Sequence, residues 1–366
     1  MMAFNDLRPQ LDRLGPDIRN AIDRVIAHGQ FIMGPEIADL EAALATRIGV
    51  RHCLSVGSGT TALEIALRAL GVGPGDEVIT TPFTWIATAN AIAMLGAVPV
   101  FVDILDDGSH LINPARVAAA VGPRTRAILP VSLFGQPAEM EMIAAAAPGI
   151  PIVEDAAQSF GATRHGRPSG ALSVVGCTSF FPSKPLGCLG DGGAIFTDDD
   201  ALAEAMRTIR THGGIRRHHH THIGTNGRMD TLQAAVLLAK LPTFDAEIGL
   251  RRTAAARYDR LLDGAAGTPH LRPGNTSVHA QYTIRLGGQR DRIADRLRAA
   301  GIPSAIYYPM PVHLQPSFAG RCRIAGGLER SEAACGSVLS LPFHPWLTEE
   351  QQEAVVGTVR QAISAG

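Results

Sequence analysis

The residues with the clearest chemical potential are a lysine and a carboxylate that follow two apolar segments. Lys184 lies in a short turn after an apolar stretch and before a glycine-rich return, and Asp155 ends another apolar stretch upstream. A lysine on a constrained turn can form an imine with the aldehyde of pyridoxal phosphate. A carboxylate at a strand end can keep the pyridine nitrogen protonated, so that the ring accepts electrons. Because a loop lysine is usually only a solvated charge, this hypothesis depends on the residues around it.

A second group of residues could bind the phosphate of such a cofactor. Gly57-Ser-Gly59-Thr60-Thr61 lies between a predicted strand and a predicted helix. Glycines let backbone amides approach an anion, hydroxyls donate hydrogen bonds, and the helix N-terminus favours negative charge. Ser179, which precedes Lys184, could add another hydroxyl. The same letters also serve as an ordinary turn and helix cap, so the motif alone leaves phosphate binding open.

An aromatic residue follows another predicted strand. Trp85 ends the run Phe83-Thr-Trp, and its flat indole could stack on an aromatic cofactor. Aromatic residues at this place more often pack in the core. The stacking role is therefore a hypothesis that the rest of the site must support.

The segment 216–222 reads Arg-Arg-His-His-His-Thr-His. Its histidines could bind a metal ion, since His218 and His222 would share one face of a helix. Glycines on both sides and the lack of a nearby acidic or thiolate ligand favour a loop instead, and we expect no metal site. A positively charged loop above an anionic substrate is the better functional interpretation.

The composition excludes several classes of protein. The 366 residues have a formal net charge of −1, with 46% hydrophobic and 18% charged residues, so neither nucleic acid nor an anionic membrane is an expected partner. The five cysteines are odd in number and show no CxxC pair, which indicates a reduced compartment. No apolar run approaches the ~18 residues of a membrane span. We expect a cytoplasmic protein.

The elements that must position these residues alternate between strands and helices. The pattern predicts strands over 52–56, 77–80, 98–103, 127–133 and 150–154, and helices over 60–70, 87–95, 114–121 and 139–146. This alternation is typical of an α/β fold with a mostly parallel sheet covered on both faces. Ligands bind such sheets at the carboxyl ends of the strands. Gly57, Phe83 and Asp155 all lie at predicted strand ends.

Beyond the predicted helix over 198–210 the pattern changes. Helices are expected over 198–210, 232–241, 251–262, 291–300 and from 348 onward, with a loop over 211–230 and a strand over 281–286. The chain is too long for one ordinary core. We therefore predict a large cofactor-binding domain of residues 1–242, including an N-terminal helical segment, and a smaller α+β domain of residues 243–366.

Taken together, these motifs resemble the DegT/DnrJ/EryC1/StrS sugar aminotransferases. The matching stretches are residues 57–63, 73–79, 82–88, 154–158, 179–184, 190–194 and 224–230. They cover nearly the whole chain. The resemblance implies fold type I of the pyridoxal phosphate-dependent transferases, with a mostly parallel seven-stranded sheet in the large domain.

The resemblance also implies a role for each matching residue. Lys184 would carry the cofactor and act as the catalytic base, Asp155 would pair with the pyridine nitrogen, and Gln158 would contact the ring hydroxyl. Trp85 would cover the ring face. Asn226 from a neighbouring subunit would join the phosphate, which implies a homodimer with shared active sites. The phosphate-binding residues of the subunit itself would be Gly59, Thr60 and Ser179.

Within the family, the run 177–188 is most similar to aminotransferases of UDP-linked 2-acetamido-2-deoxy-3-oxo-glucuronate, as are Arg216-Arg217 and Gln281-Tyr282. In that branch an arginine and a His-Tyr pair lie near the sugar carboxylate. Here the pair reads Tyr307-Tyr308, and a phenol cannot make the charge-assisted contact of an imidazolium. A neutral 3-oxo or 4-oxo hexose therefore remains open. The candidate substrate-binding residues are Arg228, Tyr307, Tyr308, His219 and His220.

The implied activity is transfer of an amino group from L-glutamate to a nucleotide-linked keto sugar, either a 3-oxo hexose or a hexuronate. Two alternatives stay open: a 4-keto-hexose aminotransferase of an antibiotic or surface-polysaccharide pathway, and a non-catalytic regulatory protein that binds pyridoxal phosphate. Related sugar dehydratases carry histidine at the position of Lys184. This residue argues against their reaction.

Overall fold

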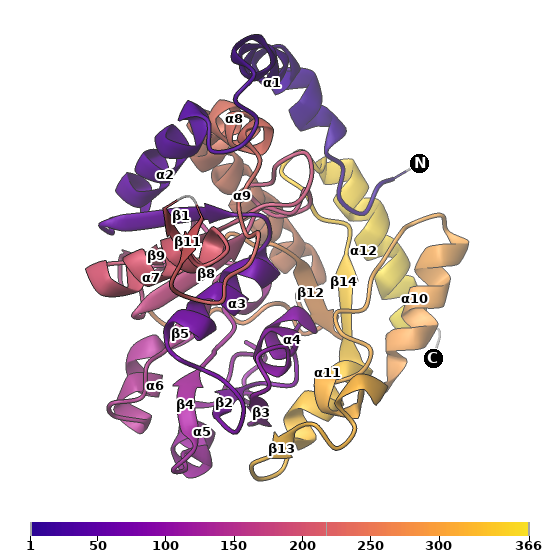
Figure 1. The fold of residues 1–366 in the computed structure, drawn as a ribbon. Coiled ribbons are helices and arrows are strands. Elements are labelled where there is room, and N and C mark those ends of the chain that lie inside the picture. The colour runs from indigo at the N-terminus through magenta and orange to yellow at the C-terminus, as the bar shows by residue number, and fades with distance from the viewer. Residues whose placement is uncertain (1, 217, 365–366) are drawn as a thin grey trace.

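The computed structural model describes residues 2–216 and 218–364 (Figure 1). Arg217, one of the residues typical of the glucuronate branch, lies outside the described residues. The strands are β1 (His52–Val56), β2 (Glu77–Thr80), β3 (Val98–Phe101), β4 (Thr125–Ile128), β5 (Val153–Asp155), β6 (Thr163–Arg164), β7 (Arg167–Pro168), β8 (Val175–Ser179), β9 (Gly193–Thr197), β10 (Gly214–Arg216), β11 (His219–His220), β12 (Tyr282–Arg285), β13 (Arg323–Ile324) and β14 (Val338–Leu341).

The helices begin and end close to the predicted positions in the first half of the chain. They are α1 (Arg8–His28), α2 (Pro35–Ile48), α3 (Gly59–Ala69), α4 (Ala87–Ala93), α5 (Pro114–Ala120), α6 (Met140–Ala146), α7 (Asp200–Arg210), α8 (Thr231–Lys240), α9 (Phe244–Leu262), α10 (Arg290–Ala299), α11 (Glu329–Ser337) and α12 (Glu349–Ser364). None of the described helices combines the length and the apolar character needed to cross a membrane.

The central sheet confirms the mostly parallel α/β architecture. Its strands follow the order β13-β3-β2-β4 and β5-β8-β9-β1, and parallel bridges from Ile128 to Ile152 and from Val131 to Asp155 join the two halves. All neighbours are parallel except β9, which runs antiparallel to both β8 and β1. Seven strands come from the first 242 residues, as predicted, and β13 adds an eighth at the edge.

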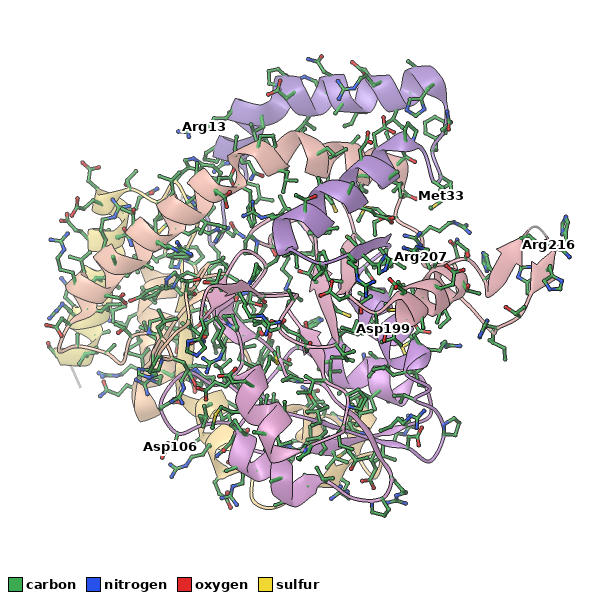
Figure 2. All side chains as sticks on the ribbon, turned by 90° about the vertical axis from the view of Figure 1, so that its left-hand side faces the viewer. Arg13, Met33, Asp106, Asp199, Arg207 and Arg216 are labelled. Atoms are coloured by element: carbon green, nitrogen blue, oxygen red, sulfur yellow. The ribbon has the colours of Figure 1, made fainter. Side chains whose placement is uncertain are left out.

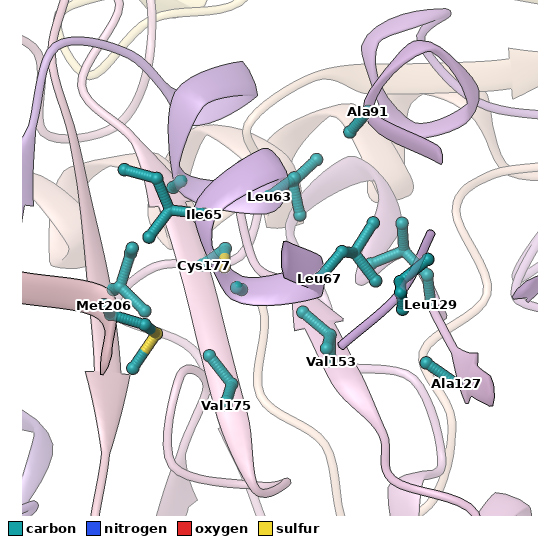
Figure 3. Packing of buried hydrophobic residues seen from close by; sticks show 14 of the residues in the cluster. Leu63, Ile65, Leu67, Ala91, Ala127, Leu129, Val153, Val175, Cys177 and Met206 are labelled. Atoms are coloured by element: carbon teal, nitrogen blue, oxygen red, sulfur yellow. The ribbon is translucent and has the colours of Figure 1, made fainter. Parts of the chain in front are cut away.

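Helix α3 is the element that connects the core to the site. Its apolar residues belong to a buried cluster with Val153 of β5 and Val175 of β8, and Figure 3 shows Leu63, Ile65 and Leu67 within it. Burial of one such side chain stabilises the fold by about 1.5–3 kcal/mol. Because α3 is packed along its length, its first turn is held at the carboxyl ends of the strands.

The second half of the chain differs most from the prediction. Helix α9 begins at Phe244 rather than at residue 251, and α11 and β14 were not predicted. Strand β14 pairs antiparallel with β12, so its partner lies far away in the sequence. Phe244 packs with α1, α2 and α8, whereas Tyr258 of the same helix packs with β12 and α12. The domain boundary at residues 242 and 243 therefore stays a prediction.

The histidine-rich segment forms a short hairpin, β10–β11, instead of the predicted open loop. Figure 2 shows the hairpin, with Arg216 labelled, projecting away from the body of the molecule. His219 and His220 are exposed. Across the part of the chain that the structure describes, no three His, Cys, Asp or Glu side chains gather into a possible metal site.

Candidate active site

The carboxyl ends of β5 and β8 and the first turn of α3 surround a cavity of about 420 Å³. This volume lies within the roughly 300–1,000 Å³ of small-molecule and cofactor sites. The predicted site residues that line it are Gly59, Thr60, Trp85, Asp155, Gln158, Ser179, Lys184, Tyr307 and Tyr308. The chain thus brings together residues that are up to 249 positions apart in sequence (308 − 59).

Lys184 is presented by a tight turn after β8. Its backbone N–H donates to the Phe181 carbonyl at 2.8 Å, and the Cys188 N–H donates to the Phe180 carbonyl at 2.8 Å. Burial of the amine lowers the pKa of Lys184, because desolvation disfavours the cation, while the charge of Asp155 acts in the opposite direction. A lysine with a lowered pKa holds more of the neutral amine near neutral pH. That form is the nucleophile and the base.

Asp155 lies at the end of β5 and is buried. One carboxylate oxygen accepts a hydrogen bond from the Thr88 hydroxyl at 2.9 Å, and the other accepts from the Ala157 N–H at 3.2 Å. Burial raises the pKa of Asp155, although these two hydrogen bonds and the nearby Lys184 oppose the shift. A cation placed at this carboxylate would relieve the cost of its desolvation.

Thr88 is a site residue that the sequence analysis missed. It stands three positions after Trp85, inside the stretch 82–88 that carries the family resemblance. Its side chain is buried in the first turn of α4, where it lies 3.1 Å from the Thr84 hydroxyl and donates to Asp155. The type of residue was visible in the sequence, but its partner follows only from the packing of α4 beside β5.

Replacing Thr88 with valine should lower kcat/KM roughly tenfold, because the isosteric side chain removes a hydrogen bond to a buried charge, worth about 1.5–3 kcal/mol. The comparison is Thr253→Val, which alters an exposed threonine whose hydroxyl bonds to the Gly249 carbonyl of its own helix. Steady-state kinetics of both variants measure the effect. Equal rates for Thr88→Val and the unaltered protein would contradict this role.

The amide of Gln158 is held by two partners. Its oxygen accepts from the Phe134 N–H at 2.8 Å, and its nitrogen donates to the Tyr308 hydroxyl at 3.0 Å. An amide nitrogen has two hydrogens, so the second one is available to an oxygen atom in the cavity. Tyr308 is buried against the rings of Phe83 and Trp85. Its contact with Gln158 gives it a positioning role beside the predicted contact with a sugar.

The start of α3 forms a cradle for an anion. The Ser58 hydroxyl caps the helix by accepting from the Thr61 N–H at 3.1 Å, and the preceding N–H groups of the first turn have no partner within the helix. A side chain at Gly59 would place its Cβ 2.7 Å from Cβ of Ser179. Glycine therefore lets Ser179 approach the helix, so that Thr60 and Ser179 face the same space.

These features fit pyridoxal phosphate. The first turn of α3 suits the phosphate, the buried Asp155 suits a protonated pyridine nitrogen, and Lys184 suits the aldehyde. Trp85 is 61% exposed although it lines the cavity, so its indole has a free face on which a ring can stack. All four functions converge on one cavity, which is what the sequence-based hypothesis required.

Four predicted residues lie outside this cavity. Asn226 is exposed on the segment that follows the hairpin, and its backbone pairs with Thr211. Arg228 pairs through its backbone with Val56 of β1, and its buried Nε has no hydrogen-bond partner within residues 2–216 and 218–364. The remaining two are His219 and His220 of the hairpin. Their predicted contacts with a ligand stay predictions.

Other residues of the cavity wall were not assigned a role from the sequence. Gln281 precedes β12, Asp191 lies in the glycine-rich return, and Phe181 and Ser183 flank the turn of Lys184. Gln281 belongs to the pair Gln281-Tyr282, which is typical of the glucuronate branch and is a usable signal. Asp191 had no such signal, because a single aspartate between glycines also suits an ordinary turn.

Comparison with known proteins shows the family of the chain. The DegT/DnrJ/EryC1/StrS aminotransferase family matches residues 12–360. The chain is 51% identical to the UDP-2-acetamido-2-deoxy-3-oxo-D-glucuronate aminotransferase of Pseudomonas aeruginosa, over 95% of this chain and 96% of the relative. It is 46% identical to a pleiotropic regulatory protein of Geobacillus stearothermophilus, over 97% of both chains.

A solved structure with the same fold is that of DesV from S. venezuelae in complex with a ketimine intermediate. It superimposes with a TM-score of 0.95 at 41% identity and covers 99% of this chain and 98% of its own. The superposition extends over both halves of the chain. The family match over residues 12–360 includes the stretches that carry the resemblance. The chain belongs to the DegT/DnrJ/EryC1/StrS aminotransferase family.

Proposed function

We propose that the chain is a pyridoxal phosphate-dependent aminotransferase that moves an amino group from L-glutamate to a nucleotide-linked keto sugar. The observation that carries this proposal is the convergence of Lys184, Asp155 and the first turn of α3 on one cavity. When bound, pyridoxal phosphate supplies an electron sink for the carbon that gains or loses a proton. The rest of the chemistry falls to the side chains of the chain.

Lys184 is the residue that moves the proton. Its lowered pKa lets the neutral amine take a proton from Cα of the amino donor and later return one to the carbon of the sugar that is aminated. Asp155 would keep the pyridine nitrogen of the bound cofactor protonated, and Thr88 holds Asp155 in place. With the cofactor bound, Gln158 would offer its free N–H to the ring hydroxyl. None of these groups needs a metal ion for its role.

The substrate that we favour is a UDP-linked 3-oxo sugar, since the Pseudomonas aeruginosa relative acts on such a compound by name. Tyr307 lines the cavity where that branch has histidine, so a neutral 3-oxo or 4-oxo hexose competes with the uronate. Among the described residues of the cavity wall, Lys184 is the one lysine or arginine. A nucleotide diphosphate would therefore need cations from outside this wall, and Arg228, Arg216, His219 and His220 are the candidates.

Those candidates suit a homodimer in which each subunit completes the site of the other. The loop before α2 exposes Phe31, Ile32 and Met33, of which 43–51% is accessible, and exposed apolar clusters mark association surfaces. Figure 2 shows Met33 and the tip of the hairpin at Arg216 toward the same side of the molecule. A second copy on this side would cover the apolar loop and bring Asn226 to its neighbour's cavity.

Mixing two inactive variants should test the shared sites. Lys184→Ala and Asn226→Ala remove groups that would come from different subunits, so a mixed dimer keeps one intact site. Random reassociation should then restore about a quarter of the unaltered rate, measured after refolding from dilute denaturant. A mixture of Lys184→Ala with Asp155→Asn is the control, because both changes affect the same subunit's contribution. Failure of the first mixture to regain activity would exclude sharing.

A glutamate half-reaction tests the function itself. Addition of L-glutamate to the protein loaded with pyridoxal phosphate should convert the visible absorbance of the aldehyde form to that of the amine form and release 2-oxoglutarate. A regulatory role is the second candidate, because the Geobacillus stearothermophilus relative is named a pleiotropic regulatory protein. A protein that binds the cofactor but leaves glutamate unchanged would favour that candidate.

We also propose a cytoplasmic location. All five cysteines are free, and Cys53, Cys177, Cys188 and Cys335 are buried. Free, buried thiols are typical of a reducing compartment. Nucleotide-linked sugars and glutamate would be available to the enzyme there.

A further inference from the structure

The N-terminal residues 2–6 run between the C-terminal part of the fold and the turn of Lys184. Met2 packs against the buried cluster that β12, β14 and α12 share. The Phe4 carbonyl accepts a hydrogen bond from the Phe343 N–H at 2.9 Å. Figure 1 shows this end of the chain beside α12, before the chain crosses to α1. The segment is therefore anchored at its beginning.

Two side chains of this segment reach the wall of the cavity. The Asn5 amide nitrogen donates to the Ser183 carbonyl at 3.1 Å, and Ser183 directly precedes Lys184. The ring of Phe4 meets the ring of Tyr307 edge to face, with 6.1 Å between the centroids. Both Ser183 and Tyr307 line the cavity. The segment thus touches the site at two separate places.

The contact of Asn5 is specific. Its amide oxygen is buried and has no hydrogen-bond partner in the described part of the chain. The orientation of the amide therefore depends on the bond from its nitrogen to the Ser183 carbonyl. The N–H of the same peptide unit, that of Lys184, donates to the Phe181 carbonyl at 2.8 Å, so the peptide unit is held on both sides. A hydrogen bond to its carbonyl restricts the peptide unit from which the Lys184 side chain starts.

We propose that Asn5 is a positioning residue for Lys184, acting through the Ser183 carbonyl. The inference rests on the proposed function, in which Lys184 holds the cofactor and moves the proton. Anchoring at Phe4 and Phe343 keeps Asn5 in register with the turn. Loss of the bond lets the turn sample other orientations, so that the amine is correctly placed for a smaller share of the time.

The test compares Asn5→Ala and Asn5→Asp with Asn20→Ala, which removes an exposed asparagine of α1. Asn5→Asp keeps the shape of the side chain but presents an oxygen to the Ser183 carbonyl. It therefore measures the effect of losing the N–H donor alone. Both Asn5 variants should lower the rate of the glutamate half-reaction roughly three- to tenfold, while KM for glutamate stays within about twofold. Asn20→Ala should match the unaltered protein.

A second readout separates positioning from loss of stability. The visible absorbance of the bound cofactor titrates with pH, and its midpoint should shift by about 0.3–1 unit in both Asn5 variants. A slower reaction with an unchanged midpoint and a lower thermal midpoint would assign Asn5 a merely structural role and overturn the proposal. So would an unchanged rate in both variants. If borohydride fails to fix the cofactor to Lys184 in the unaltered protein, the proposed function itself is wrong.

Discussion

Replacing Lys184 with alanine should lower transamination by on the order of 10⁴-fold, because both the covalent anchor of the cofactor and the base that moves the proton are lost. The glutamate half-reaction, followed by absorbance, measures the rate. The variant should still bind pyridoxal phosphate weakly, since the cradle of α3 and Asp155 are unchanged. It should lack the absorbance of the lysine-bound cofactor.

The sequence offers an unusually clean control for this experiment. Lys184 and Lys240 are the only lysines in the chain. Lys240 is buried at the end of α8, and its amine donates to the Gly187 carbonyl at 2.7 Å. Borohydride reduction followed by peptide mass analysis should therefore find the cofactor on Lys184 in both the unaltered protein and Lys240→Arg. Cofactor attached to Lys240, or full turnover by Lys184→Ala, would refute the assignment.

The parts of the site that were predictable from the sequence are those that lie at strand ends. Asp155 and Lys184 follow short apolar segments whose pattern predicts buried strands, and parallel strands bring their carboxyl ends to one edge of a sheet. Gly59 precedes a helix whose periodicity is visible in its own residues. For such positions, local pattern and global topology agree.

The roles that escaped prediction depend on contacts between distant segments. Thr88 reaches Asp155 because α4 packs beside β5, and Tyr308 reaches Gln158 across 150 positions of sequence. No local pattern encodes either pairing. The same reason explains the fold errors, since β14 pairs with β12 although α10 and α11 lie between the two strands in the sequence.

Residues that would act across a subunit interface pose a different difficulty. Asn226 and the hairpin histidines matched a family pattern, yet they lie outside the cavity of their own chain. Within one subunit, an exposed asparagine beside a glycine is indistinguishable from an ordinary loop residue. Such a residue would gain its environment only from a second copy, so its role in the site stays a prediction.

Replacing Asp155 with asparagine should lower kcat about 10²–10³-fold, because a neutral amide cannot keep the pyridine nitrogen protonated and loses electrostatic stabilisation of the reacting state. The shape of the side chain is kept, and the Thr88 hydroxyl can turn to accept from the new amide. Asp17→Asn, an exposed position on α1, is the matched control. Steady-state kinetics at saturating cofactor separate the loss of kcat from weaker binding of the cofactor.

The same variant should be more stable than the unaltered protein when no cofactor is bound. Burial raises the pKa of Asp155, so the ionised carboxylate favours the unfolded chain at any pH above its folded pKa. At pH 7 to 8, Asp155→Asn should therefore raise the thermal midpoint of the cofactor-free protein. The advantage should disappear as the pH falls through the folded pKa of Asp155 toward its unfolded value near 4.

Pyridoxal phosphate should reverse this order. A pyridinium beside Asp155 stabilises the ionised carboxylate, so the unaltered protein binds the cofactor more tightly and gains more from saturation than the variant does. Thermal midpoints measured at pH 7.5 with and without cofactor should therefore cross. If Asp155→Asn instead lowered the thermal midpoint of the cofactor-free protein, the carboxylate of Asp155 would stabilise the fold without the cofactor. Its charge would then not be a destabilising group that the fold keeps for the cofactor.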